Sequence, residues 1–229
     1  MKKGFTLAEV LITLGIIGIV AALTMPSLVT KYKEKETVVK LKKVYSILDN
    51  AMKMAINEQG VIADQWGLVY GEPQTFVDII SPYLKITKNC RISAGCFASG
   101  TYHSLTGQNA YFGDTATNFS KFILSNGTSV AVWMQPTSTF LGTLVIDLNG
   151  KKSPNTNGKD VFWFQILKDR IIPTGIEDDD TYTFDSCNLT KTGFGTGRGC
   201  TGWVIYNENM DYLHCNDLSW SGKTKCKNL

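Results

Sequence analysis

Six cysteines are the side chains of this sequence whose chemistry is most narrowly constrained. The 229-residue chain has no CxxC pair and only two histidines. A zinc site normally needs closely spaced cysteines or supporting histidines, so disulfide bonds are the better interpretation. We expect three local bridges, namely Cys90–Cys96, Cys187–Cys200 and Cys215–Cys226. Because disulfides require an oxidising compartment, the region that contains them is expected outside the cytoplasm.

Catalysis by a cysteine nucleophile finds little support. His214 and Cys215 are neighbours in sequence, but a nucleophilic cysteine needs a base brought to its sulfur, which adjacent side chains rarely achieve. We therefore expect no enzymatic activity. Residues 1–59 hold 9 of the 23 Lys and Arg and 5 of the 20 Asp and Glu, which leaves 14 against 15 in residues 60–229. That balance gives no clustered positive charge, so no nucleic-acid partner is expected.

A polar loop near the middle of the chain contains a second candidate set of ligands. Asp147, Asn149 and Asp160 carry the oxygen atoms that hard cations prefer, which suggests a calcium site. The loop is not an EF-hand, because Lys151 occupies a ligand position and Gly158 stands where the bidentate glutamate belongs. The alternative is a long hairpin loop made rigid by Asx-turns, glycine and proline. No other cofactor is indicated.

A single carboxylate marks the start of the chain. Lys2 and Lys3 precede an apolar run of 20 residues, 10–29, which is long enough to cross a membrane once as a helix. Glu9 lies at the edge of this run. The run is longer than the apolar core of a cleaved secretory signal, which argues against that alternative. A charge drawn into the bilayer costs about 2.5–3.5 kcal/mol, so Glu9 is expected to have a partner.

Cleavage between Gly4 and Phe5 would create such a partner. The new α-amino group on Phe5 is a cation near neutral pH and lies four residues before Glu9, on the same helix face. Between two helices offset along their axes, the amine of one chain would meet the carboxylate of the next. Such a pair in a low dielectric is costly to break by removing one partner, so it would fix the register of assembly.

The heptapeptide GFTLAEV that starts at Gly4 resembles the processing and methylation motif of type IV pilins and type II secretion pseudopilins. In that family a membrane-embedded peptidase cuts after the glycine, here Gly4, and methylates the next residue, here Phe5. The glutamate that corresponds to Glu9 guides assembly into a helical fibre. Gly18 and Pro26 match positions where the family commonly has helix-loosening residues.

The resemblance implies a structural subunit of a type IV pilus or pilus-like fibre. Its implied partners are other pilin subunits, prepilin peptidase and an inner-membrane assembly platform. It implies a single-pass protein of the inner membrane with its head outside the cytoplasm, which later joins a fibre at the cell surface. A minor pilin acting as adhesin or assembly initiator, and a type II secretion pseudopilin, remain alternatives. Glu9 favours ordinary positions along the fibre, since family members that cap the tip often lack it.

The elements that must carry these residues follow from periodicity. From Thr37 the spacing of Val38, Leu41, Tyr45 and Leu48 alternates between three and four residues, which predicts an amphipathic helix. Four strands are predicted, at residues 119–124, 128–134, 141–148 and 161–167. Residues 90–127 are rich in Gly, Ser, Thr and Asn and are expected to be loop with short elements.

These elements predict an α+β, pilin-like fold: a long N-terminal helix packed on an antiparallel sheet of about four strands, with a disulfide-tethered C-terminal region. We divide the chain into a cleaved leader (1–4), a long helix (5–59) and a globular head (60–229). Within the helix, the membrane-spanning part is expected at about 10–29 and the amphipathic part at about 37–58.

Overall fold

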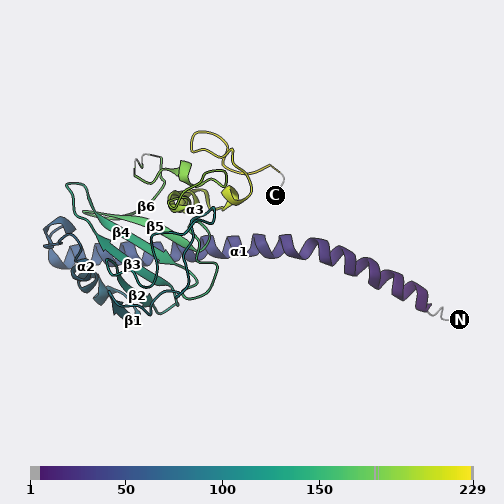
Figure 1. The fold of residues 1–229 in the computed structure, drawn as a ribbon, viewed down its shortest axis with the longest axis horizontal. Coiled ribbons are helices and arrows are strands. Elements are labelled where there is room, and N and C mark those ends of the chain that lie inside the picture. The colour runs from purple at the N-terminus through teal and green to yellow at the C-terminus, as the bar shows by residue number, and fades with distance from the viewer. Residues whose placement is uncertain (1–5, 178, 180, 228–229) are drawn as a thin grey trace. The chain divides into compact units, whose positions relative to one another are not determined.

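A computed structural model describes residues 6–177, 179 and 181–227 of the chain. The chain divides into two compact units, Met1–Glu36 and Thr37–Leu229. The boundary falls inside the first helix, α1, which runs from Leu7 to Gln59 (Figure 1). We describe the two units separately.

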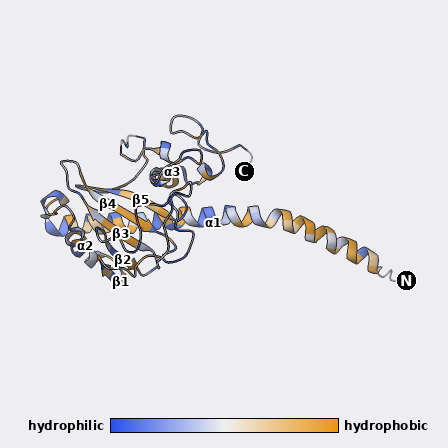
Figure 2. Ribbon diagram, viewed as in Figure 1, coloured by the Kyte–Doolittle hydropathy of each residue, from blue (hydrophilic) through white to orange (hydrophobic). Residues whose placement is uncertain are grey.

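Within the first unit, residues 10–29 of α1 are predominantly apolar around the whole circumference of the helix. The side chains of Leu11, Ile16 and Leu23 are exposed, as are most of their neighbours, and Figure 2 shows the apolar colouring along this part of the helix. Among the described residues, α1 is the one helix long and apolar enough to cross a membrane. An apolar helix surface of this kind needs lipid or other helices around it.

The part of α1 in the second unit is amphipathic. Its buried residues are Val38, Leu41, Val44, Leu48, Ala51, Met52 and Ala55. They follow the helical repeat and form one apolar stripe that packs on the sheet. The helix ends at Gly60, whose backbone has a φ of +68° and whose N–H still bonds to the Ile56 carbonyl.

The sheet has six antiparallel strands in sequential order, two more than the four central ones that the sequence predicts. The strands are β1 (Ile86–Arg91), β2 (Ser120–Leu124), β3 (Ser129–Met134), β4 (Phe140–Asp147), β5 (Val161–Leu167) and β6 (Ile171–Pro173). Within the described part of the chain, the short helices are α2 (Pro73–Ile80), α3 (Thr201–Asn207) and five 3-10 turns at Ala63–Gln65, Ser81–Tyr83, Phe184–Ser186, Arg198–Cys200 and Asp211–Leu213. The predicted plan of a long helix on an antiparallel sheet is confirmed.

Both faces of the sheet are covered. The face that includes Phe162, Phe164 and Ile166 belongs to the core shared with α1, α2 and α3. The opposite face includes Val161 and Trp163 and belongs to a second apolar cluster. This division follows the predicted alternation along β5, because successive side chains of a strand point to opposite faces.

The second cluster is covered by the long segment between β1 and β2. Phe97, Tyr102 and Phe112 meet edge to face there, with ring centroids 4.9 to 6.1 Å apart. Asp114 orders the segment by accepting backbone N–H bonds from Gly95, Cys96 and Phe97. This fully described segment has no helix or strand, in line with the loop that its composition predicts, but it is packed as a layer on the sheet.

The six cysteines form three disulfides: Cys90–Cys96, Cys187–Cys200 and Cys215–Cys226. These are the local pairs expected from the sequence. The last two tie together the C-terminal region, which contains α3 and little other regular structure. Cross-links of this kind limit the freedom of the unfolded chain and hold such a region in place.

Candidate functional site

The N-terminal end of α1 is built around Thr6 and Glu9. The Glu9 Oε2 atom accepts hydrogen bonds from the Thr6 backbone N–H at 2.8 Å and the Thr6 hydroxyl at 2.7 Å, and the Glu9 N–H donates to the Thr6 hydroxyl at 3.3 Å. This reciprocal pairing is a capping box, and it starts the helix at Leu7. It also holds the Glu9 carboxylate at the helix N-terminus, where the peptide dipoles favour negative charge.

Thr6 is a residue of this arrangement that the sequence interpretation did not name. Thr6 followed three residues later by Glu9 is the usual sequence signal for a capping box, so the sequence alone could have identified this pair. Gly4 and Phe5 lie outside the described residues. Cleavage after Gly4 and methylation of Phe5 therefore stay predictions.

Gly18 and Pro26 lie inside α1 without interrupting it. Nothing lies within 4 Å of the position where a Cβ atom of residue 18 would stand, so this glycine leaves a flat spot on the helix surface. Pro26 lacks an N–H and removes one hydrogen bond from the helix. The hydroxyl of Thr30 donates to the Pro26 carbonyl at 3.0 Å. The role of both residues in assembly stays a prediction.

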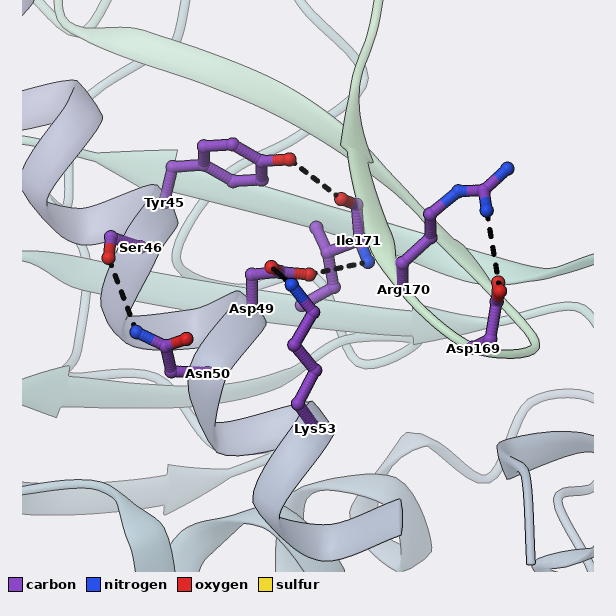
Figure 3. Close-up of polar contacts among 8 residues, drawn as sticks. All are labelled: Tyr45, Ser46, Asp49, Asn50, Lys53, Asp169, Arg170 and Ile171. Carbon is purple, nitrogen blue, oxygen red and sulfur yellow. Dashed lines mark hydrogen bonds and ion pairs between the residues drawn. The ribbon is translucent and has the colours of Figure 1, made fainter. Parts of the chain in front are cut away.

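A second feature of α1 fastens its amphipathic part to the edge of the sheet (Figure 3). The Tyr45 hydroxyl donates to the Ile171 carbonyl at 3.1 Å, and Asp49 Oδ1 accepts from the Ile171 N–H at 3.2 Å. Ile171 is in β6, the strand at one edge of the sheet. Burial, followed by the charge of Asp49, raises the pKa of Tyr45 to about 12, so the hydroxyl keeps its proton.

These two bonds use backbone groups that an edge strand would otherwise leave open. Unpaired N–H and C=O groups at a sheet edge favour pairing with strands of other molecules. Tyr45 also stacks on Phe164 of β5, with ring centroids 5.4 Å apart. The helix therefore both covers the sheet and closes part of its edge.

The candidate calcium residues come together in the structure. Asn149 connects the two carboxylates: its backbone N–H donates to Asp147 Oδ1 at 3.1 Å and its Nδ2 to Asp160 Oδ2 at 2.7 Å. The Tyr102 hydroxyl donates to Asp147 Oδ2 at 2.7 Å, and the Thr156 N–H donates to Asp160 Oδ1 at 2.7 Å. Each carboxylate oxygen thus has a donor from the protein itself.

Burial dominates the electrostatics of this cluster. It raises the pKa of Asp147 to about 7, against the hydrogen bond from Tyr102, and it also raises the pKa of Asp160. Burial and the charge of Asp147 raise the pKa of Tyr102 above its usual range. The geometry corresponds to a loop organised by Asx-turns. Within the described residues, no three His, Cys, Asp or Glu side chains are grouped as a metal centre requires. Calcium binding stays a prediction.

The adjacent His214 and Cys215 do not form a nucleophilic pair, because the Cys215 sulfur is bonded to Cys226. An oxidised sulfur is neither a thiolate nor a metal ligand.

Comparison with known proteins identifies one part of the chain. Residues 1–25 match the family model of the prokaryotic N-terminal methylation motif, the signature of type IV pilins and prepilins. No curated protein and no solved structure matches the chain. The motif indicates a structural, pilin-like protein and suggests membrane anchoring through the apolar helix.

Proposed function

We propose that this pilin-like chain is a structural subunit of a type IV pilus or pilus-like fibre. The observation that carries the proposal is the methylation motif at residues 1–25, which stands directly before a helix able to cross a membrane. In this proposal, prepilin peptidase removes residues 1–4 and the amino group of Phe5 is methylated. The inner-membrane assembly platform then transfers the subunit from the membrane to the growing fibre, where the apolar helices of the subunits pack together.

The capping box gives Glu9 a defined part in this assembly. Its three hydrogen bonds with Thr6 use the Oε2 atom and the N–H, and within the described residues Oε1 has no partner. We propose that Oε1 binds the α-amino group of a neighbouring subunit. Thr6 then acts as a positioning residue that holds the carboxylate for that contact. Because the pair lies among apolar helices, loss of the carboxylate leaves the amine without its counter-ion.

The disulfides and the helix support the proposed location. Three disulfides in residues 90–226 require an oxidising compartment, which supports a head outside the cytoplasm. The apolar part of α1 supports a single membrane crossing before assembly. The partners proposed are further pilin subunits, prepilin peptidase and the assembly platform, with no nucleic acid.

Processing and assembly are tested by two variants. Gly4→Leu is expected to keep its leader, and mass spectrometry of the membrane fraction measures this directly. A Gly4→Leu protein that still begins at Phe5 would place the cut elsewhere. Glu9→Ala is expected to be processed and held in the membrane but absent from sheared fibres. Glu34→Ala, a carboxylate of the same helix beyond the apolar run, is the matched control and should enter fibres normally.

A minor subunit and a secretion pseudopilin share the same motif and helix. Subunit abundance in sheared surface fibres separates them: a major pilin dominates the fibre, a minor pilin is present in traces, and a pseudopilin is absent from surface fibres. The proposal of a pilus subunit fails if the chain is found only in a periplasmic secretion complex.

A further inference from the structure

Arg198 is a partly buried cation without an acidic partner among the described residues. Its guanidinium lies over the Trp163 ring, 4.2 Å from the centroid, and 5.6 Å from the centroid of Phe194. Its Nε atom is buried and has no hydrogen-bond partner within that same part of the chain. Burial lowers the pKa of Arg198 from its usual value, whereas the charge interaction and side-chain hydrogen bond with Tyr182 raise it. An arginine nevertheless stays charged near neutral pH.

The backbone around Arg198 is fixed. Cys200, two residues on, is bonded to Cys187. The Gly197 N–H donates a hydrogen bond to the Ser186 carbonyl at 2.8 Å, and the Arg198 carbonyl accepts a hydrogen bond from the Thr174 hydroxyl. The guanidinium is thus held in place before any ligand arrives, which lowers the entropy cost of binding.

Arg198 lines an open hollow of about 370 Å³ in the C-terminal region. The exposed residues Thr181, Thr183 and Thr192 also line it, and their hydroxyls make no hydrogen bond within the described residues. The two other charged residues of the lining, Lys191 and Asp185, are paired with each other at 2.9 Å. Among the described lining residues, the unbalanced charge is therefore the positive charge of Arg198.

An exposed pair of aromatic rings lies beside this guanidinium. Tyr111 is 77% exposed and Phe194 is 48% exposed, and their ring centroids are 4.6 Å apart. Tyr111 also lines a neighbouring hollow formed by residues between 99 and 116. Aromatic rings exposed next to polar hollows offer a negative face to the C–H groups of a ligand and mark binding surfaces.

We propose that Arg198 and the ring pair Tyr111–Phe194 form a binding site for an acidic saccharide. The guanidinium takes the carboxylate or sulfate group in a bidentate contact, which its fork of N–H donors fits. The apolar C–H face of a sugar ring packs on the aromatic pair, and the sugar hydroxyls exchange hydrogen bonds with the threonine hydroxyls. Apart from the Lys191–Asp185 ion pair, the wall is uncharged and rich in hydroxyls, which favours a saccharide over an acidic peptide. The site goes beyond fibre assembly and does not depend on Glu9.

The test compares two matched ligand pairs on the full chain in non-ionic detergent, with affinity measured by calorimetry. Sialyllactose and sulfated lactose carry an acid on the same sugar scaffold that lactose offers without one. Either acidic sugar is expected to bind about ten-fold or more tightly than lactose, because one charged hydrogen-bonded contact is gained. Arg198→Gln should remove this preference, and Arg198→Lys, which keeps the charge but not the fork, should restore only part of it.

Two further variants keep the test decisive. Arg170→Gln removes an exposed guanidinium that is paired with Asp169 elsewhere on the head, and it should bind as the wild type does. Tyr111→Ala alters an exposed ring that the fold does not require and should weaken every sugar several-fold. If Arg198→Gln lowers the melting temperature so far that the variant does not fold, Tyr111→Ala is the variant that tests the site.

Three results would overturn the proposal: equal affinity for lactose and the acidic sugars, equal loss in Arg170→Gln and Arg198→Gln, or Arg198-dependent binding of an acidic hexapeptide alone. None of these results would bear on the proposal of a fibre subunit, because incorporation into fibres is measured separately.

Discussion

The contact between α1 and strand β6 allows the packing of the helix on the sheet to be tested with single substitutions. Both backbone groups of Ile171 are bonded by helix side chains, the N–H by Asp49 and the C=O by Tyr45. Ile171 is only 1% exposed, so water cannot readily replace a lost partner. Asp49→Ala leaves the Ile171 N–H buried without an acceptor.

The expected loss follows from the cost of an unsatisfied buried donor. A hydrogen bond to a charged acceptor contributes about 1.5–3 kcal/mol, so Asp49→Ala should lower the free energy of unfolding by about 2 kcal/mol. Its ion pair with Lys53 adds little, because the Lys53 side chain is 58% exposed. Tyr45→Phe removes one neutral bond but keeps the stacking on Phe164, so about 1 kcal/mol is expected. For a domain of this size, about 2 kcal/mol corresponds to a fall of about 4–8 °C in melting temperature.

The measurement is thermal unfolding of the full chain in non-ionic detergent, followed by the near-ultraviolet circular dichroism of the head. Asp49→Asn keeps an acceptor oxygen and should lose less than Asp49→Ala. Asp169→Ala is the matched control, since Asp169 is exposed and pairs only with Arg170 among the described residues. Asp169→Ala should change the free energy of unfolding by about 0.5 kcal/mol or less, and its melting temperature should hardly move. The reasoning is refuted if Asp49→Ala melts no lower than this control.

Three further predictions concern the head. Burial raises the pKa of Asp147 to about 7 from an ordinary 3.8, so the protonated carboxyl stabilises the fold at low pH and this contribution is lost as pH rises through about 7. The free energy of unfolding should therefore fall by up to about 4 kcal/mol between pH 4 and pH 8. Asp147→Asn should flatten the dependence of melting temperature on pH. In Gly175→Ala the new Cβ would collide with the backbone carbonyl oxygen of Gly199, at a residue whose φ is +79°, so denaturant unfolding should show a loss of about 2 kcal/mol or more in the free energy of unfolding. Gly107→Ala, also at positive φ but with open space around it, separates the cost of the clash from the cost of the backbone conformation. Replacing both Cys187 and Cys200 by serine should cost about 3 kcal/mol and expose the C-terminal region to protease, and unchanged proteolysis would contradict the role given to that bridge.

The elements that the sequence predicts are those with a strong repeat. The stripe of α1 that includes Leu41 and Leu48 follows the helical period, and β5 alternates between its two buried faces. Strands β1 and β6 carry no such pattern. β1 is polar and its pairing with β2 is irregular, and β6 has three residues and ends at Pro173. Their pairing is decided by neighbouring strands and by α1, which local sequence does not encode.

The layer between β1 and β2 was unpredictable for a related reason. Its order depends on buried polar side chains that bond to backbone groups of the same segment, outside any regular helix or strand pattern. Lys121 is fully buried on β2 and donates to the carbonyls of Asp114 at 2.7 Å and Ala116 at 2.6 Å. A buried lysine in a strand cannot be assigned such partners without the fold. At the N-terminus, by contrast, Gly4, Phe5 and Glu9 lie within six consecutive residues of the sequence, so a short motif was enough to find Glu9.

The most direct test of the central claim is the intact mass of the subunit recovered from sheared surface fibres. The account predicts a chain that begins at Phe5, carries one added methyl group and retains three disulfides. A fibre-free, membrane-bound protein that still begins at Met1 would contradict it.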